Sequence, residues 1–367
     1  MFPESRDIRA LVIAATGRTG GAERYIARLY GGLATRGIHG SLLGELPEWQ
    51  QTGLMSLSPA LGPKWEPSTL PTGLVRLPLE RRRVARAIGR LDFDLTHMHF
   101  KREQVGLTDI ASRRGPVIWT EHGRLSQSLY GRAMGKAYRR AAERVAAITC
   151  VSALVADSVR DVVHSNVRVE VIENSVDTQQ FTFVTEAERH SARESLAIQS
   201  SKTIASFVGR LVSSKRPLLA RRLIEDVAGT LLVAGDGPES RSLNSGSSEG
   251  SIRLLGDVPD PRIVYQASDV LLFLSDGSGE GFPTVLLEAA ACGVPVVGTE
   301  DCGFASEIEA AGGVVAAPTV RALKEGMQVV LDDRDRRASV AREWALDHDS
   351  RGWLDEHVRL FVELVGR

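Results

Sequence analysis

The chain has 367 residues, of which 43% are apolar and 25% are charged, and its formal net charge is −1. This length favours two domains over one, and the composition is ordinary for a soluble globular protein. No apolar run approaches the roughly 18 residues that a membrane-spanning helix needs. Basic residues are not interleaved with aromatic ones and no nucleic-acid-binding motif occurs, so we expect no nucleic-acid partner.

The N-terminal residues and the cysteines predict a cytoplasmic protein. The first 17 residues contain only a strand-length apolar stretch and lack the layout of a signal peptide. The three cysteines, Cys150, Cys292 and Cys302, show no metal-ligand spacing and no even disulfide framework. This pattern is typical of a reducing compartment.

The charge is distributed unevenly along the chain. Residues 1–181 contain 25 Lys and Arg against 18 Asp and Glu, a net charge of +7, and the remainder has a net charge of −8. The densest basic patch, residues 76–90, has the pattern of an amphipathic helix. Two interpretations stay open: peripheral contact with an acidic membrane surface, or ordinary solvated helices rich in arginine.

Short apolar runs alternate with helix-like stretches. The predicted strands are residues 8–15, 39–45, 94–100, 117–122 and 146–152, followed by 203–209, 229–235, 251–256, 269–275 and 294–299. This alternation predicts parallel sheets with helices on both faces. We therefore expect an α/β protein of two doubly wound, Rossmann-like domains facing a central cleft, with ligands at the carboxyl ends of the strands.

The polar, sheet-poor stretch 173–202 contains the join between the domains. We place the domains at residues 1–180 and 181–345, with a C-terminal helix at 346–367 inside a segment that reads as helical from about residue 336.

Glycines follow the first predicted strand, in the sequence TGRTGGAE at residues 16–23. Between a strand and a helix, Gly20 and Gly21 allow backbone N–H groups to meet an anion. The same glycines fit an NAD(P)-dependent reductase, but the GxGxxG spacing is absent and no Tyr is followed four residues later by Lys. A tight strand–helix turn without a ligand is the structural alternative.

Two cations follow the first strand of the second series. Arg210 supplies a planar fork and Lys215 a point charge, which together suit a diphosphate at the carboxyl end of a strand. As solvated loop charges they would be unremarkable. After a later strand, the backbone of Val258 could meet a nucleobase.

The segment from Glu280 to Glu288 combines two carboxylates with a helix start. Pro283 favours the first turn of a helix, and Gly281 lets backbone approach a ligand closely. The free N–H groups of such a helix start are a natural seat for phosphate. The two carboxylates could be a general acid and base, but beside Arg210 and Lys215 they indicate a grip on a sugar and a ribose.

Histidines and aspartates elsewhere give weaker signals. His122 ends a predicted strand and should point into the cleft, although a lone histidine is more often structural. Asp92-Phe93-Asp94 resembles the Asp-x-Asp metal motif, but it precedes a strand and so lies away from the cleft. His97 and His99 are a pair on one strand face, which is weak evidence for metal.

Together these segments resemble the retaining, nucleotide-sugar-dependent glycosyltransferases of family 4, which have the two-domain GT-B fold. The matching pieces occur in the family's order over about residues 10–300: Gly20-Gly21-Ala22-Glu23, His122, Asn174-Ser175-Val176-Asp177 with Phe181, Gly209-Arg210-Leu211 with Lys215, Gly235-Asp236-Gly237-Pro238, Glu280-Gly281-Phe282-Pro283 through Glu288, and TEDCGFASEI at 299–308. Ser175 stands where the family usually has Gly, and neither this departure nor Pro283 touches the proposed chemistry.

The resemblance implies an N-terminal acceptor domain, a C-terminal nucleotide-sugar domain, and a C-terminal helix that crosses back to the N-terminal domain. It implies transfer from a UDP- or GDP-linked sugar to an acceptor hydroxyl with retention at the anomeric carbon, without a metal or another cofactor. The implied catalytic residues are His122, Arg210, Lys215 and Glu280. The implied donor-binding residues are Gly20, Gly21, Arg210, Lys215, Val258, Glu280, Gly281, Phe282, Pro283, Thr284 and Glu288.

The acceptor stays open at this point. Assembly of cell-surface polysaccharide or glycolipid fits the basic N-terminal half, and a small metabolite such as an aminocyclitol fits the compact length equally well. Two remote alternatives are the NAD(P)-dependent reductase and a catalytically silent protein that binds a sugar nucleotide or another partner.

Overall fold

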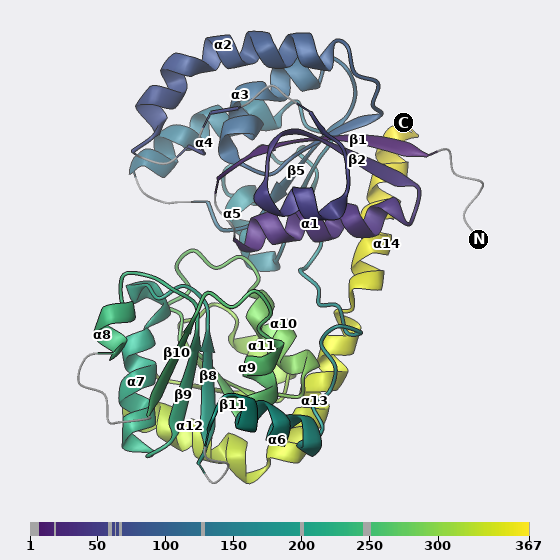
Figure 1. Ribbon diagram of the computed structural model, residues 1–367. Coiled ribbons are helices and arrows are strands. Elements are labelled where there is room, and N and C mark those ends of the chain that lie inside the picture. Colours follow the sequence, from purple (N-terminus) through teal and green to yellow (C-terminus); the bar gives the residue numbers. More distant parts are fainter. Residues whose placement is uncertain are drawn as a thin grey trace. The chain divides into compact units, whose positions relative to one another are not determined.

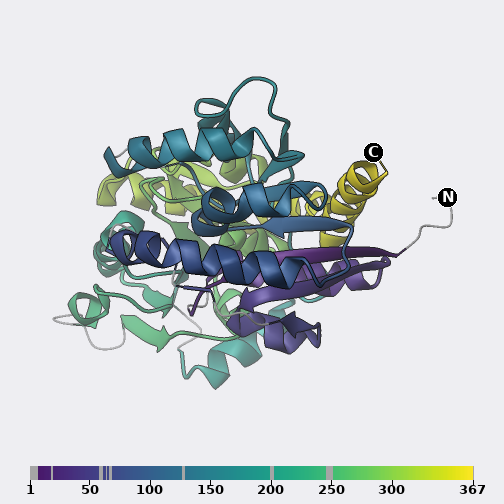
Figure 2. The ribbon, with the colours of Figure 1, turned by 90° about the horizontal axis from the view of Figure 1, so that it is seen from above.

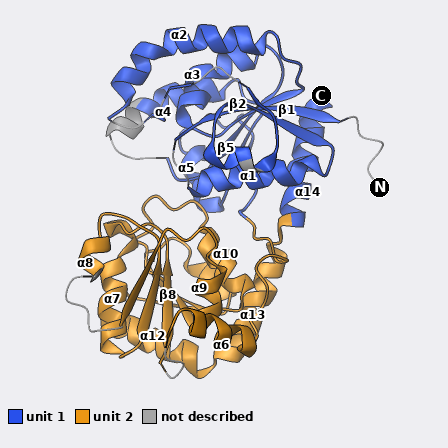
Figure 3. Ribbon diagram, in the orientation of Figure 1, with its two compact units in different colours: residues 1–174, 351–367 blue, residues 175–350 orange. Residues whose placement is uncertain are grey.

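A computed structural model describes residues 7–17, 20–57, 61–62, 64–65, 68–125, 129–198, 202–244 and 251–366. The chain forms two compact units, coloured separately in Figure 3. Unit 1 contains residues 1–174 and 351–367, and unit 2 contains residues 175–350. Each unit is built around its own parallel sheet.

The sheet of unit 1 has seven parallel strands in the order β3-β2-β1-β4-β5-β6-β7 (Figure 1). Its strands are β1 (Ile8–Ala15), β2 (Ile38–Glu45), β3 (Ser56–Leu57), β4 (Leu95–Met98), β5 (Val117–Glu121), β6 (Ala147–Cys150) and β7 (Val169–Val171). The sequence of β1, IRALVIAA, is a nearly continuous apolar run, and seven of its eight residues are buried. A strand that is buried on both faces reads in this way, so β1 takes a central position.

Helices cover both faces of this sheet. They are α1 (Gly21–Ala34), α2 (Leu70–Ile88), α3 (Lys101–Ala111), α4 (Leu129–Ala142), α5 (Ala153–Arg160) and α14 (Ser350–Val365), with a 3₁₀ turn η1 (Pro47–Thr52). Figure 1 shows α2, α3 and α4 on one side of the sheet and α1 on the other. Seen from above in Figure 2, α2, α3 and α4 lie side by side in that order. The helix predicted over the basic patch 76–90 is thus confirmed as the greater part of α2.

The C-terminal helix α14 belongs to unit 1 from Arg351 onward. Its buried residues recur at helical spacing: Trp353, Leu354, His357, Leu360, Phe361 and Leu364. The Tyr25 hydroxyl of α1 lies 2.9 Å from His357 Nε2, and the Arg168 guanidinium forms a two-pronged ion pair with Glu363, at 3.0 and 2.7 Å. The last turns of the chain therefore complete the core of the first unit.

The sheet of unit 2 has six parallel strands in the order β10-β9-β8-β11-β12-β13. Its strands are β8 (Ile204–Val208), β9 (Thr230–Ala234), β10 (Ile252–Gly256), β11 (Val270–Phe273), β12 (Val296–Thr299) and β13 (Val314–Ala316). Its helices are α6 (Glu186–Ser195), α7 (Pro217–Asp226), α8 (Ser240–Asn244), α9 (Arg262–Ala267), α10 (Thr284–Ala291), α11 (Ala305–Ala310), α12 (Val320–Asp332) and α13 (Arg334–Asp347), with a 3₁₀ turn η2 (Ser213–Lys215). One core packs the sheet against α7 and α12, through side chains such as Leu223, Leu231 and Leu323.

The predicted α/β class with two parallel sheets is confirmed. Each of the ten predicted strands corresponds to a strand of the structure, and eight of the observed strands are one to three residues shorter than predicted. The edge strands β3, β7 and β13 were not predicted, because two or three residues show no periodicity. The C-terminal helical segment is divided at His348 and Asp349 into α13 and α14. Among the described helices, none has the length and apolar character needed to cross a membrane.

Candidate functional site

Close-packed glycines end the strands of unit 2. Gly209 follows β8 and Gly235 follows β9, both with positive φ, at 142° and 135°. A Cβ atom added at Gly235 would lie 1.9 Å from the Gly209 carbonyl oxygen. Only glycine fits this contact, so the backbones of the two loops lie against each other at the carboxyl edge of the sheet.

Lys215 and Glu280 meet at this same edge. Lys215 ends the 3₁₀ turn after β8, Glu280 lies between β11 and α10, and their side chains form an ion pair. The exposed fractions of the two side chains are 21% and 7%, so the pair is largely shielded from water. The Lys215 ammonium also lies 5.7 Å from the centre of the Phe273 ring. The structure therefore brings together two predicted residues that are 65 positions apart in the chain.

The next residue, Arg216, fixes the lysine loop in place. It adopts a left-handed conformation at φ 53° and ψ 47°, and its guanidinium donates to both carboxylate oxygens of Asp301, at 2.8 and 2.5 Å. This pairing lowers the pKa of Asp301. The backbone N–H of Asp276 donates to the Ser214 carbonyl at 2.8 Å, which adds a second tie to the loop after β11. The sequence alone does not point to the pairing of Arg216 with Asp301, because no local spacing links the two residues.

Arg210 differs from its neighbours in being exposed. Leu211, the next residue, is buried, and its backbone bonds the Asp236 carbonyl and the Glu239 N–H, at 2.9 and 3.0 Å. Among the described residues, the Arg210 side chain forms no ion pair. A rigid loop thus presents a guanidinium that can bind an anion.

Glu288 lies in the second turn of α10, partly buried. Its Oε2 accepts a hydrogen bond of 2.7 Å from the hydroxyl of Tyr265 in α9. Burial raises the pKa of Tyr265 well above its ordinary value, so this hydroxyl keeps its proton and donates it. The carboxylate is therefore oriented before any ligand arrives. The sequence did not indicate Tyr265.

The residues between the two glutamates contribute mainly backbone. Pro283 is the N-cap of α10 and Thr284 its first residue. The Phe282 side chain is buried against Phe304, with ring centres 5.6 Å apart. Gly281 is partly exposed. The segment can therefore offer N–H groups at the start of a helix, as the sequence predicted.

Val258 follows β10, and its partly buried side chain packs against the core of unit 2. With the side chain used for packing, its backbone remains as the group that could contact a ligand. That expectation stays a prediction.

His122 follows β5 at the carboxyl edge of the sheet in unit 1 and belongs to a cluster of aromatic rings. Its Nε2 lies 3.1 Å from Nδ1 of His99, and its ring centre lies 4.8 Å from that of Tyr25. Burial, with smaller effects of Lys64 and Lys101, lowers the pKa of His122 to about 3. The imidazole is therefore neutral at pH 7 and can accept or donate one hydrogen bond.

Two lysines that the sequence analysis missed lie near His122. Lys101, the first residue of α3, pairs with Glu121, and Lys64 lies 3.6 Å from Glu23 of α1. Lys101 directly follows the loop after β4, so the strand-end reasoning that found His122 could have found it too.

The glycine loop after β1 is described in part, since Arg18 and Thr19 lie outside the described residues. Gly20 is the N-cap of α1, in an extended conformation. Beside Gly21 a Cβ atom would meet no neighbour within 4 Å, so its backbone faces open space. A Cβ atom at Gly20 would lie 2.8 Å from the Glu23 carboxylate, so the open space that an anion could use at the start of the helix lies at Gly21.

The Asp-x-Asp segment lies at the amino edge of the same sheet. Asp92 and Asp94 both bind the side chain of Arg9, the second residue of β1. His97 bonds Tyr30 and Thr120 inside the core, at 2.8 and 2.7 Å. These residues have structural partners in the described part of the chain.

Comparisons with known proteins agree with this architecture. The family description "Glycosyltransferase Family 4" matches residues 19–180, and "Glycosyl transferases group 1" matches residues 188–344. The chain is 32% identical over 219 residues to a D-inositol 3-phosphate glycosyltransferase of Corynebacterium urealyticum, covering 54% of this chain and 50% of that protein. It is 24% identical over 241 residues to the N-acetyl-alpha-D-glucosaminyl L-malate synthase of Bacillus anthracis, covering 62% of each. The chain thus spans 50% of the length of the first of these relatives and 62% of the second.

Solved structures resemble the whole chain. Anabaena HepE, crystallised in complex with UDP, has a TM-score of 0.80 and 16% identity, covering 97% of this chain and all of that one. Sucrose-phosphate synthase of Thermosynechococcus elongatus has a TM-score of 0.78 and 17% identity, covering 98% and 99%. At this identity the likeness shows the two-domain α/β fold.

Proposed function

The chain belongs to glycosyltransferase family 4 and has the GT-B fold. From this premise we propose that it transfers the sugar of a UDP- or GDP-linked donor to an acceptor hydroxyl, with retention at the anomeric carbon. The observation that carries the proposal is the shielded Lys215–Glu280 pair at the carboxyl edge of the sheet in unit 2, where the exposed Arg210 belongs to the same loop as Lys215. Membership of the family rules against the remote alternative of an NAD(P)-dependent reductase.

Arg210 and Lys215 are the proposed diphosphate ligands. At an effective dielectric constant near 20, a cation about 4 Å from a phosphate charge contributes about 4 kcal/mol before desolvation. Lys215 is held by Glu280, and its loop is tied down through Arg216. The cation is therefore in place before charge develops on the departing phosphate, which is the arrangement that stabilises a transition state. We infer that no metal is needed for this step.

The other donor contacts follow the geometry of unit 2. Glu288, already oriented by Tyr265, would accept hydrogen bonds from the ribose hydroxyls. Glu280 and the backbone of Gly281, Phe282, Pro283 and Thr284 would hold the transferred sugar, and the backbone of Val258 would meet the base. From unit 1, Gly20 and Gly21 would approach the phosphates, and neutral His122 would bind a sugar hydroxyl.

In the proposed reaction the bond from the anomeric carbon to the phosphate oxygen breaks, and a bond to the acceptor oxygen forms on the same face. The acceptor proton passes to an oxygen of the leaving phosphate. The transition state has oxocarbenium character, as in other glycosyl chemistry. Since the acceptor oxygen attacks directly on the face from which the phosphate leaves, the chain needs no nucleophile of its own.

Two acceptor classes remain as proposals. Cell-surface polysaccharide or glycolipid is our first choice of acceptor, because helices α2, α3 and α4 of unit 1 carry a basic surface. With such a surface the enzyme would work at the cytoplasmic face of a membrane. The three cysteines are buried and free, as expected in a reducing compartment. A small metabolite is the second choice, because two relatives are named for small acceptors, an inositol phosphate and malate.

Thermal unfolding with nucleotides tests the donor. UDP or GDP at about 100 times its Kd should stabilise the protein by about 2.7 kcal/mol, whereas NADPH should not. Screening UDP- and GDP-sugars for slow hydrolysis without acceptor then identifies the sugar. The proposal fails if neither nucleotide raises Tm, or if the anomeric configuration of the product is inverted.

A further inference from the structure

Helix α2 has one side that is buried against its neighbours and a second side, rich in apolar residues, that faces solvent. Its buried residues are Gly73, Glu80, Val84 and Ile88. On the other side, Leu74, Val75 and Leu79 are 50%, 81% and 53% exposed. Within the described chain nine large hydrophobic side chains are exposed, and three of them lie within the six residues 74–79. Scattered exposed apolar residues are ordinary, but such a concentration indicates an interaction surface.

The exposed apolar residues form a stripe. Pro71 and Pro78 are exposed as well, and together with Leu74, Val75 and Leu79 they follow the three- and four-residue spacing of one helix side. The stripe occupies the N-terminal half of α2. Interior packing does not explain it, because none of these side chains is buried.

Arginines surround and continue the stripe. Arg76, Arg82, Arg83 and Arg86 are exposed, and in the described structure none of the four forms an ion pair. The helix contains one acidic residue, Glu80, which is buried and accepts a hydrogen bond from the backbone of Gly62 at 3.1 Å. The outward side of α2 is therefore apolar and cationic, with no opposing charge.

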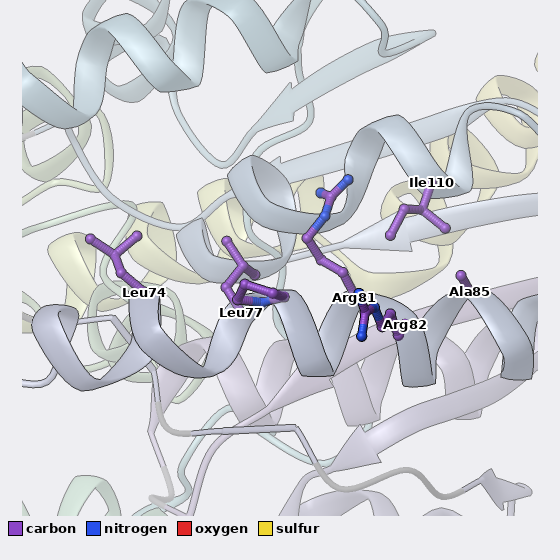
Figure 4. A pocket seen from close by; sticks show the side chains of 7 residues that line it. Leu74, Leu77, Arg81, Arg82, Ala85 and Ile110 are labelled. Atoms are coloured by element: carbon purple, nitrogen blue, oxygen red, sulfur yellow. The ribbon is translucent and has the colours of Figure 1, made fainter.

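The neighbouring helices extend the cationic surface. A hollow of about 410 Å³ between α2 and α3 is lined by Leu74, Arg81 and Arg82 among others (Figure 4). A second hollow, of about 580 Å³, lies between α3 and α4, where Arg113, Arg140 and Arg144 face a single carboxylate. That carboxylate, Asp109, is paired with Arg81. Each hollow is large enough for a phosphate group beside a guanidinium.

We propose that the outer surface of α2, α3 and α4 docks on an anionic phospholipid bilayer. In this arrangement α2 lies in the plane of the interface, Leu74, Val75 and Leu79 enter the boundary between headgroups and acyl chains, and the arginines bind lipid phosphates. Figure 2 shows why the three helices can act together, since they lie side by side in one layer.

The charge and polarity select this partner over two others. A second copy of the chain would place arginine stripes against each other in a two-fold interface, which is repulsive. A soluble polyanion would satisfy the arginines but leave the stripe of leucines and valine in water. A bilayer with anionic headgroups satisfies both features at once.

Vesicle co-sedimentation of the full chain tests the surface. The protein should bind phosphatidylcholine vesicles that contain phosphatidylglycerol, bind pure phosphatidylcholine vesicles much less, and dissociate as salt is raised. The double variant Arg82→Glu and Arg83→Glu should weaken binding on the order of 30-fold or more. The double variant Leu74→Ser and Leu79→Ser should weaken binding and reduce its persistence at high salt.

Matched controls come from unit 2. Arg321→Glu with Arg336→Glu makes the same change of charge at exposed arginines, and Val329→Ser with Leu346→Ser removes comparably exposed apolar side chains. Both controls should bind vesicles like the parent chain. Unchanged Tm and unchanged circular dichroism of the variants show that they are folded.

Three outcomes would overturn the proposal: equal binding to neutral and anionic vesicles, equal losses in the control variants, or binding to soluble heparin with no binding to anionic vesicles. The last outcome would assign the surface to a soluble polyanion. None of these measurements uses sugar transfer, so a negative result leaves the proposed reaction untouched and bears only on the choice of a membrane-linked acceptor.

Discussion

Lys215 is the residue on which the proposed chemistry depends most. Its ammonium is shielded, paired with Glu280, and fixed by a loop that Arg216 ties to Asp301. Such preorganisation means that charge on a leaving phosphate is met without rearrangement of the site.

Lys215→Ala should therefore lower the rate constant of donor hydrolysis and transfer by about 100- to 1,000-fold. The control is Lys324→Ala, which removes an exposed lysine of the same unit that pairs with Asp226. Steady-state kinetics with the identified donor measures both variants. Unchanged kcat in Lys215→Ala would refute the diphosphate assignment.

Glu288 should act on binding of the donor more than on turnover. Glu288→Ala should raise the donor KM with a smaller change in kcat, since a ribose contact exists in both the ground state and the transition state. Tyr265→Phe removes the hydroxyl that orients this carboxylate and should raise KM less. If Glu288→Ala changes only the KM of the acceptor, the ribose role is wrong.

Strand-end reasoning was effective for single residues. It placed Arg210 and Lys215 at the carboxyl edge of a parallel sheet, where a polar residue after a buried strand must lie, and the helix start singled out Glu280; the donor-binding roles of the three residues stay predictions. It missed Asp301 and Tyr265, whose importance depends on contacts made 85 and 23 positions away in the chain. Their roles follow from the folded loops, which no local pattern describes.

At the scale of elements, helix α14 lies far along the chain from residues 1–174, the part of unit 1 that it stabilises. The helix starts in unit 2 and then packs on unit 1, where Phe361 lies with its ring centre 5.5 Å from that of His97. The sequence predicted a C-terminal helix, but its break at His348 depends on tertiary contacts. One of these is the backbone pairing of Val176 with Asp349.

Phe361→Ala should lower the free energy of unfolding by about 3–5 kcal/mol, because it leaves a cavity beneath α14. The control, Val362→Ala, alters an adjacent side chain that is 39% exposed and should change stability by less than about 0.5 kcal/mol. Hydrogen exchange gives a finer readout: amides of unit 1 should lose protection while those of unit 2 keep it. Equal losses in both units would contradict the assignment of α14 to unit 1.

At the scale of the whole molecule, buried histidines determine how stability changes with pH. Burial lowers the pKa of His97 and His99 well below the ordinary value, that of His122 to about 3, and that of His357 to about 4. His357 shows the reason. It is completely buried, so a second proton would put a positive charge in the core without hydration, and its Nε2 already accepts from the Tyr25 hydroxyl.

In the unfolded chain these histidines therefore bind protons near pH 6.5, whereas in the folded chain they stay neutral. The free energy of unfolding should fall as the pH drops from about 6.5 toward 4. Each such histidine contributes a slope of about 1.4 kcal/mol per pH unit in this window. Urea unfolding at pH 7, 6 and 5 measures the slope. His357→Phe should reduce it by one histidine's share, and exposed His190→Gln should leave it unchanged. A free energy of unfolding that stays constant from pH 7 to 5 would contradict this prediction.

The two-sheet architecture could be predicted at this scale because ten strands alternate with helices along the chain. The order of strands and helices does not by itself show that unit 1 takes its last helix from beyond unit 2; the family resemblance implied a C-terminal helix that crosses back to the N-terminal domain. Which distant segment fills a gap in a core is decided by packing, and the sequence shows only that the segment is amphipathic.

Because unit 1 is made of two separate stretches of the chain, its folding has to wait during translation. The ribosome makes residues 1–174 first, but the helix that covers Tyr25, Gly32 and His97 emerges only after residues 175–350 have been synthesised. At about 5–20 residues per second this delay is roughly 9 to 35 seconds. Throughout that interval the nascent first unit exposes an apolar face that a chaperone can recognise, and a truncated message would leave that face permanently uncovered.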